Sequence, residues 1–349
     1  MEIGIYTFGD LPVGVHGALA SQQRLEEILA AARLADEVGL SVFGVGEHHR
    51  SDYAVSAHSV VLGAIAAVTK RIRLTSAVTI LSSADPVRVF EDFATLDLLS
   101  GGRAELMAGR GAFVESFPLF GYDLQDYNSL YEEKLDLLLQ LNQSERISWR
   151  GKHRPPLQYA EVSPRPLNGL LPIWIGAGGT PQSAVRAGQL GLPLNLANIG
   201  GEPAQFRPFI DLYRKTGLDA GHKHEALKVA VSAHCHVQRD SQQASDQFYP
   251  HYQSYLRHNL PQRDRGWTVP RADFEQLASP RGCLFVGSPQ QIIDKILYEH
   301  ELFGHQRFLA QIDIGGLPYR LVAQSIELLG TEVLPAVKRA LGQSSSFTA

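Results

Sequence analysis

The stretch IRLTSAVTILSSADPVRVFEDFATLDLLSGGRAELMAG, residues 72–109, decides the fold. Its first part, Ile72 to Leu81, is rich in β-branched residues and predicts a strand. A helix is expected to begin at Asp85-Pro86, an N-cap residue followed by proline at the first helical position, and to stop at Gly101-Gly102. Ala104 to Gly109 predict another strand. Strand, helix and strand in succession are typical of a parallel sheet covered by helices.

The same alternation runs through the whole chain. Eight strands are expected, at residues 3–8, 42–45, 72–81, 104–109, 173–176, 192–197, 227–237 and 307–314. Helices are expected at about 21–38, 59–69, 85–100, 126–141, 181–190, 203–216, 241–257, 289–303 and 318–340, the last kinked by Pro335. Eight such units without a linker predict a closed (β/α)8 TIM barrel. A doubly wound sheet normally carries G-x-G-x-x-G after its first strand, and Gly9-Asp10-Leu11-Pro12 does not fit that fingerprint.

The chain is longer than a bare barrel needs. Its 349 residues exceed the roughly 250 residues of a typical barrel by about 100. We expect one barrel domain over residues 1–349, with insertions after strands four and seven at about 111–171 and 258–304. Both insertions follow carboxyl ends of strands, so we expect them to form walls or a lid over the site.

The composition argues against a nucleic-acid partner and a membrane span, and it indicates the cellular compartment. The 32 basic and 36 acidic residues give a net charge of −4, and no block of lysine and arginine indicates a nucleic-acid partner. No apolar stretch approaches the roughly 18 residues that span a bilayer, and residues 1–8 do not read as a leader. Two cysteines, Cys235 and Cys283, fit a reducing compartment. We therefore expect a soluble, cytoplasmic protein.

A histidine-rich motif follows the second strand. Active sites of such barrels lie at the carboxyl ends of the strands, and Gly46-Glu47-His48-His49-Arg50 occupies that place. Imidazole titrates near neutrality, so we expect His48 to do acid/base work. A metal site is the alternative, but it would need further ligands such as His234 and His236, which serve equally well as core histidines. We expect no metal.

A glycine-rich turn follows the fifth strand. Gly178, Gly179 and Thr180 lead into a helix that starts at Pro181 and contains Ser183. The free N–H groups of a helix start suit a phosphate. Arg110, after the neighbouring fourth strand, would grip the same phosphate. A plain tight turn and a surface ion pair are the alternatives. Small residues at 75–79 leave room for a flat ring or for close strand packing.

These motifs, taken in order, resemble one family. They are Gly46-Glu47-His48-His49, Pro86-Val87-Arg88, Leu96 to Arg103, Gly109-Arg110-Gly111, the loop at 175–179, Gln189 to Pro193, and Val286 to Pro289. In order and spacing they are similar to the bacterial luciferase-like, flavin-dependent monooxygenase superfamily over nearly the whole chain. The resemblance implies a (β/α)8 barrel, usually dimeric, that binds reduced FMN or, in one branch, coenzyme F420.

The resemblance also assigns roles to residues of this chain. It implies that His48 assists formation or breakdown of a flavin hydroperoxide. It implies a non-prolyl cis peptide at Ala77-Val78 against the flavin ring. It places the phosphate at Arg110, at the 178–180 loop and at Ser183. Luciferase itself has a reactive cysteine where Gly109 stands, so light emission is not expected.

The expected function is a two-component monooxygenase. A separate flavin reductase would supply reduced FMN, which reacts with O2 to a C4a-hydroperoxyflavin that oxygenates a small organic substrate. Phe8, Phe113 and Phe117 are expected to line an apolar substrate pocket. The alternatives are an F420-dependent hydride-transferring oxidoreductase, a flavin-binding protein without oxygenase activity, and a metal-dependent hydrolase that uses His48 and His49. The sequence does not identify the substrate.

Overall fold

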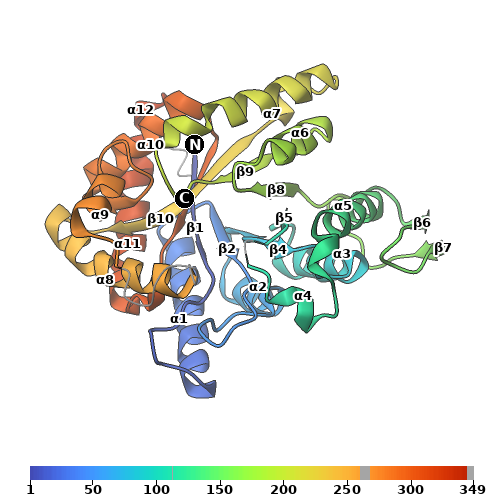
Figure 1. Cartoon of the computed structure of the whole chain (residues 1–349), viewed down its shortest axis with the longest axis horizontal. Helices are drawn as coiled ribbons and strands as arrows, with labels where there is room; N and C mark the ends of the chain where they lie inside the picture. Colours follow the sequence, from blue (N-terminus) through green and yellow to red (C-terminus); the bar gives the residue numbers. More distant parts are fainter. Residues whose placement is uncertain (112, 260–267, 344–349) are drawn as a thin grey trace.

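Eight parallel strands close into a barrel in the computed structural model, which describes residues 1–111, 113–259 and 268–343 (Figure 1). Around the barrel the strands are β1 (Glu2–Thr7), β2 (Val42–Val45), β3 (Arg73–Ser76), β5 (Ala104–Gly109), β8 (Ile173–Ala177), β9 (Leu194–Ala197), β10 (Val229–Val237) and β12 (Arg307–Gln311). Closure is seen at Arg307, which pairs with Glu2 of β1 on one side and with Ala230 of β10 on the other. The predicted (β/α)8 barrel is confirmed.

Helices cover the outside of the barrel (Figure 1). Those that connect successive barrel strands are α1 (Ala18–Glu37), α2 (His58–Val68), α3 (Pro86–Ser100), α5 (Tyr127–Gln143), α6 (Pro181–Gln189), α7 (Arg207–Asp219) and α10 (Pro289–Phe303). After β12 come α11 (Tyr319–Leu328), a π-helical turn η5 (Leu329–Val333) and α12 (Leu334–Ala340). Proline has no N–H for an α-helical hydrogen bond, so the irregularity expected at Pro335 takes the form of this wider turn just before it.

The third predicted strand is wrong as a continuous element. Instead of one strand over 72–81, the chain forms β3 and then a two-residue strand β4 (Thr79–Ile80). Between them the peptide bond Ala77–Val78 is cis, as the resemblance implies. Both short strands pair with β5, so the wall of the barrel continues across the break.

The lower half of the barrel interior is filled. Tyr6, Met107, Trp174 and Leu309 pack together inside the ring of strands. Below them Arg307, which is 2% exposed, donates to both carboxylate oxygens of Glu105 at 2.6 and 3.1 Å. A buried charge is tolerated when it is paired and hydrogen-bonded in this way. The cavity described below lies on the other side of this plug, toward the carboxyl ends of the strands.

The insertion after β5 contains two different parts. Its first part, with the short helix α4 (Ser116–Leu119) and a 3-10 turn η1 (Leu124–Asp126), lies at the carboxyl ends of the strands. Its second part is an antiparallel hairpin of β6 (Arg146–Trp149) and β7 (Leu157–Glu161).

The hairpin does not cover the barrel. It lies beyond α5 at the edge of the molecule (Figure 1). Trp149 Nε1 donates to Asp136 Oδ2 at 3.0 Å, and the backbone N–H of His153 donates to Glu133 Oε1 at 2.8 Å. Both carboxylates belong to α5. The expectation that residues 143–171 form a wall or lid is therefore wrong, because the end of α5 directs this segment along the outer face of its own helix.

The insertion after β10 does reach the site. It contains α8 (Ser241–Asn259), α9 (Arg271–Ala278) and a short strand β11 (Phe285–Gly287) that extends the sheet at β10. Tyr255 of α8 contributes to the central cavity described below. The helix expected as an addition at 289–303 is α10, which serves as the ordinary barrel connection to β12. Residues 260–267, within the expected insertion, lie outside the described residues.

Candidate active site

A cavity of about 320 Å3 opens at the carboxyl ends of the barrel strands. Every barrel strand, or the loop that follows it, contributes to its lining. The sequence-predicted residues that line it are Phe8, His48, Ala77, Val78, Arg110, Phe113, Gly178 and Thr180. Residues that lie far apart in the sequence thus meet where a barrel enzyme normally has its active site.

His48 stands on one side of this cavity in an aromatic cage. Its ring centroid lies 4.6 Å from that of Phe8, 4.3 Å from Tyr53 and 4.7 Å from Phe113. Its Nδ1 lies 3.3 Å from Glu115 Oε1. Burial lowers the pKa of His48 below its ordinary value of 6.5, while the hydrogen bond to Glu115 acts in the opposite direction. The imidazole is therefore neutral at pH 7, with a proton on Nδ1 directed at the carboxylate.

Glu115 complements this neutral imidazole. Burial raises its pKa, but the hydrogen bond from His48, together with a backbone hydrogen bond and the positive charge of Arg50, outweighs that effect and holds the pKa below its usual value. Glu115 therefore remains a carboxylate. The two residues come from the loops after β2 and β5, so no local sequence pattern joins them.

Glu47 explains the rest of the histidine-rich motif. Its Oε1 accepts the backbone N–H of Ile80 at 2.6 Å, and its Oε2 pairs with His49 Nε2 at 3.0 Å. His49 is therefore held by Glu47, whereas His48 is held by Glu115. Adjacent residues on an extended segment point to opposite sides, and only His48 of the two lines the cavity.

Arg110 lies beside the first turn of α6. Its guanidinium donates to Thr180 Oγ1 at 3.0 Å, to Ser183 Oγ at 3.2 Å and to Asn128 Oδ1 at 3.0 Å. These partners are neutral, and no carboxylate within the described ranges forms an ion pair with Arg110. The surface ion pair considered for Arg110 is thus not found.

The arrangement around Arg110 suits a phosphate monoester. A guanidinium, two hydroxyl groups and a helix start converge, and this combination is typical of phosphate sites. Thr180 is the N-cap residue of α6, and its side chain makes no capping hydrogen bond. Gly178, two residues before it, has open space where a side chain would lie. A phosphate can therefore approach the backbone of this loop closely.

Ala77 and Val78 form an apolar wall of the cavity beside the candidate phosphate site. A Cβ atom on Gly109 would lie 2.5 Å from Val78 Cγ2, and one on Gly176 would lie 2.6 Å from Val78 Cγ1. Val78 thus fills the space that side chains at these two positions would need. This contact explains why a cysteine does not fit at Gly109. Together with the phosphate donors beside it, the wall gives a phosphorylated, ring-bearing cofactor both an anchor and a surface.

Three predicted residues do not line the cavity directly. Gly179 and Ser183 stand behind the lining, although Ser183 contacts it through its bond to Arg110. Phe117 departs from the expectation for a different reason. It is fully buried and stacks on Tyr127 at 5.5 Å, so Tyr127 lies between it and the cavity. Phe117 supports the wall instead of forming it.

Several lining residues escaped the sequence reasoning. They are Tyr6, Tyr127, Asn195, Ser232, Tyr255 and Gln311, with Glu115 behind His48. One signal was present for two of them: Asn195 and Gln311 are polar residues next to apolar residues of buried strands. Buried polar groups usually have a partner or a function. Tyr127, Tyr255 and Glu115 carry no comparable signal, because only tertiary structure brings them to the cavity.

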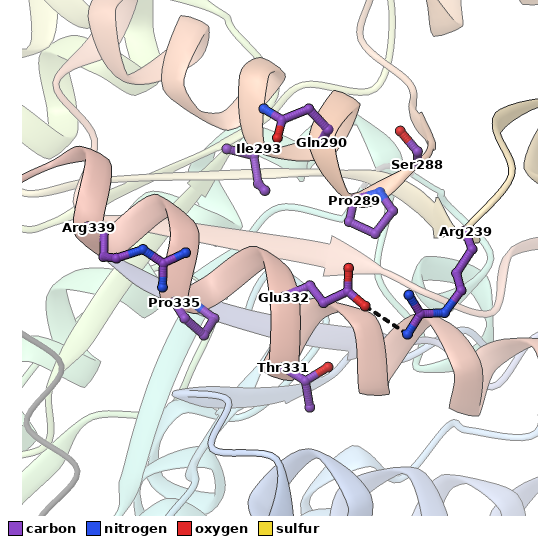
Figure 2. A pocket seen from close by; sticks show the side chains of 9 residues that line it. All are labelled: Arg239, Ser288, Pro289, Gln290, Ile293, Thr331, Glu332, Pro335 and Arg339. Atoms are coloured by element: carbon purple, nitrogen blue, oxygen red, sulfur yellow. Dashed lines mark ion pairs between the residues drawn. The ribbon is translucent and has the colours of Figure 1, made fainter.

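A second recess, of about 490 Å3, lies on the outer surface between the start of α10 and the η5–α12 segment (Figure 2). Arg239 there pairs with Glu332 at 2.9 Å. The first turn of α10 is already capped by Ser288 and Gln291. This recess contains none of the predicted site residues.

The described residues contain neither a cluster of metal ligands nor a membrane-spanning helix. Over residues 1–111, 113–259 and 268–343, no three histidine, cysteine, aspartate or glutamate side chains converge in a way that would hold a metal ion. Within the same ranges, no helix combines the length and the apolar character needed to cross a bilayer.

Comparison with known proteins decides the family. The family model described as luciferase-like monooxygenase matches residues 1–306. The chain belongs to this family. One relative of this chain is the alkanal monooxygenase alpha chain of Photorhabdus laumondii. The two sequences are 24% identical over 346 residues, which cover 90% of this chain and 92% of the relative. The N-acetyl-S-alkylcysteine monooxygenase of Bacillus subtilis is 34% identical over 182 residues, covering 51% of this chain and 52% of its own.

Solved structures of similar fold include several oxidoreductases. Monooxygenase RslO1 of Streptomyces bottropensis superposes with a TM-score of 0.82 at 22% identity, covering 96% of this chain and 99% of the other. The oxygenating constituent of Pseudomonas putida 3,6-diketocamphane monooxygenase, solved with FMN, gives 0.75 at 19% identity, with 96% and 98% covered. The F420-dependent tetrahydromethanopterin reductase of Methanopyrus kandleri gives 0.73 at 19%, with 97% and 99% covered. These solved structures show that the barrel fold is shared, and membership of the luciferase-like monooxygenase family makes the protein an oxidoreductase.

Proposed function

We propose that the protein is a monooxygenase that binds reduced FMN and uses O2 to oxygenate a small organic substrate. One observation carries the proposal. Among the described residues Arg110 has only neutral hydrogen-bond partners, and it lies beside the start of α6, next to the apolar wall of Ala77 and Val78. FMN carries a phosphate and a flat ring, and the spacing of these features along one side of the cavity suits both.

Each residue then has a definite task. Arg110, Thr180 and Ser183 would bind the phosphate, with the backbone of Gly178 and Gly179 close to it. Ala77 and Val78 would support one face of the ring. Bound reduced FMN would supply the electrons that activate O2.

Oxygenation at the opposite face of the ring needs a group that donates or accepts a proton, and it needs water to be excluded. His48 would hold or deliver a proton at Nε2, because its Nδ1 is engaged by Glu115. Phe8, Phe113 and Tyr255 line the cavity and would exclude water from the reacting atoms. Flavin reductase as electron donor, a homodimeric assembly and a cytoplasmic location complete the proposal and stay predictions.

Cofactor choice and activity are tested together. Titration of the protein with oxidised FMN and, separately, with F420 should give tight binding of FMN by its visible spectrum and weak binding of F420. With reduced FMN and labelled dioxygen, a substrate screen of aldehydes, amines and aromatic compounds should yield a product that contains the label. Tight binding of F420 alone, with hydride transfer and no labelled product, would support the F420-dependent alternative.

A further inference from the structure

The wall of the cavity formed by β9, β10 and β12 contains polar groups that the proposed cofactor site does not use. In the ring of eight strands, β10 stands opposite β3, so the wall of β9, β10 and β12 faces the wall of Ala77 and Val78 across the cavity. If the flavin ring rests against Ala77 and Val78, its other face looks toward β9, β10 and β12. That facing wall therefore borders the substrate.

The amide of Gln311 is held in one orientation by its neighbours. Its Oε1 accepts from Tyr6 OH at 3.3 Å and lies 2.8 Å from His234 Nδ1. A carbonyl oxygen accepts only, so both neighbours act as donors. Gln311 Nε2 is buried without a partner among the described residues, and the residue lines the cavity. The wall thus contains one unused hydrogen-bond donor.

Asn195 adds to the same wall a hydrogen-bond acceptor, Oδ1, that has no partner among the described residues. Its Nδ2 donates to Ser232 Oγ at 3.0 Å, and Ser232 Oγ in turn donates to the carbonyl of Leu196 at 3.4 Å. These bonds fix the amide of Asn195 and leave its Oδ1 buried with no partner in the described part of the chain. Asn195 is 4% exposed and Gln311 1% exposed, so each unpaired atom makes the empty wall energetically costly.

The wall is also uncharged. The side chains that β1, β9, β10 and β12 contribute to the cavity include no lysine, arginine, aspartate or glutamate. Burial lowers the pKa of His234 to about 4, so this histidine is neutral at pH 7. A carboxylate or ammonium group of a ligand would meet no opposite charge there.

We infer that the β9–β10–β12 wall selects an uncharged substrate of the amide class, whose C=O accepts from Gln311 Nε2 and whose N–H donates to Asn195 Oδ1. These groups come from one amide or from neighbouring amides of the same molecule. The inference rests on the proposed function, because it takes the Ala77–Val78 side for the cofactor. The flavin itself carries C=O and N–H groups on its ring, so the test separates substrate binding from flavin binding.

The test uses ligands of equal shape on the FMN-loaded protein, with binding measured by titration calorimetry. The probes are N-acetylglycine butylamide, butyl acetoxyacetate, in which oxygen replaces both N–H groups, and N-hexanoylglycine, which ends in a carboxylate. The diamide should bind about tenfold more tightly than the diester, since the diester leaves Asn195 Oδ1 unpaired. The carboxylate should bind weakest.

Variants assign the preference to residues. Asn195→Leu should remove the difference between diamide and diester. Gln311→Glu keeps an oxygen for Tyr6 and His234 but loses the donor, and should weaken both ligands about tenfold. Gln238→Glu is the matched control, because Gln238 is 5% exposed and its Nε2 is also unpartnered among the described residues, yet it does not line the cavity. Asn195→Ala replaces Asn195→Leu if the latter does not fold.

The outcomes separate the two proposals. FMN affinity should stay within twofold of wild type in every variant. Equal binding of diamide and diester, or strongest binding of the carboxylate, would overturn the inference. A tenfold loss of FMN affinity in Gln311→Glu or Asn195→Leu would overturn it too, because the wall would then bind the flavin. If FMN does not bind to wild type, the proposed function fails, and the same ligand series on the cofactor-free protein still tests the wall.

Discussion

Glu115 Oε1 lies 3.3 Å from His48 Nδ1, although the two residues belong to different loops of the barrel. This contact fixes which nitrogen of His48 carries the proton and leaves Nε2 for the cavity. Burial lowers the pKa of His48 below 6.5, and Glu115 opposes that shift. Glu115→Gln removes the opposing charge, so the acidic limb of the kcat/KM profile should move to lower pH. A limb that stays in place would show that Glu115 does not act on His48, and a limb that moves to higher pH would contradict the direction of its effect.

His48→Gln should separate binding from chemistry. The variant keeps a polar side chain of similar reach but cannot transfer a proton at Nε2. FMN affinity should stay within about twofold, while the rate of oxygenation should fall about 100-fold to 10,000-fold, the usual contribution of a general acid or base. His222→Gln, far from the cavity, serves as the control for histidine replacement. Unchanged turnover in His48→Gln would exclude the proposed role.

Arg110→Gln tests the phosphate site through two flavins. A guanidinium that binds a phosphate contributes a charge-assisted hydrogen bond of about 1.5–3 kcal/mol, so FMN should bind about 10-fold to 100-fold more weakly. Riboflavin has no phosphate, and its affinity should not change between wild type and variant. Equal weakening of both flavins, measured by fluorescence titration, would place Arg110 at another part of the cofactor.

Two glycines, Gly176 on β8 and Gly178 just after it, should respond differently to replacement by alanine. A Cβ on Gly176 would lie 2.6 Å from Val78 Cγ1, whereas one on Gly178 would meet nothing within 4 Å. Gly176→Ala should therefore displace Val78 and lower the denaturation midpoint, with a cost of about 1–3 kcal/mol as for other overpacked sites. Gly178→Ala should leave stability unchanged. Equal stability of both variants would contradict the close contact at Val78.

Glu299 offers a prediction for stability. Burial raises its pKa to about 8, from 4.5 in the unfolded chain. A raised folded-state pKa means that the folded form holds the proton more strongly, so wild type loses stability as pH rises from 4.5 to 8. Glu299→Gln removes this titration. In urea unfolding, the free energy of unfolding of the variant should increase relative to that of wild type as pH rises through this window, by up to about 1.4 kcal/mol per pH unit. A difference independent of pH would contradict a protonated Glu299.

The barrel could be predicted because each strand and helix carries local signals. β-branched runs, the Asp85-Pro86 helix start and the glycines after helices recur around the chain, and eight repeats leave few topologies. The break between β3 and β4 could not be predicted from the residue types of Ile72 to Leu81, because the β-branched residues on both sides of it favour one continuous strand. Only the family resemblance indicated the cis bond at Ala77–Val78. The hairpin at 146–161 was missed for another reason: the contacts that hold it against α5 are tertiary and leave no local pattern in the sequence.

The candidate site also contains residues that the sequence predicts and residues that only the tertiary structure places. His48, Arg110 and Thr180 stand at strand ends or a helix start, so strand prediction alone places them at one end of the barrel. Glu115 acts through a contact over 67 residues of sequence, and its loop has no regular pattern that would direct it inward. Phe117 looked equivalent to Phe113, but one turn of α4 buries it behind Tyr127. Loops thus decide which of several similar side chains meet the cavity.

The central claim is that the cavity binds reduced FMN and uses O2 for oxygenation. The most direct measurement is stopped-flow reoxidation of reduced FMN by O2, with and without an excess of protein, followed by the flavin spectrum. The account predicts that wild-type protein changes the course of reoxidation, that Arg110→Gln weakens this effect, and that a substrate receives labelled oxygen in the same mixture. Reoxidation identical to that of free reduced FMN at saturating protein, with no labelled product, would contradict it.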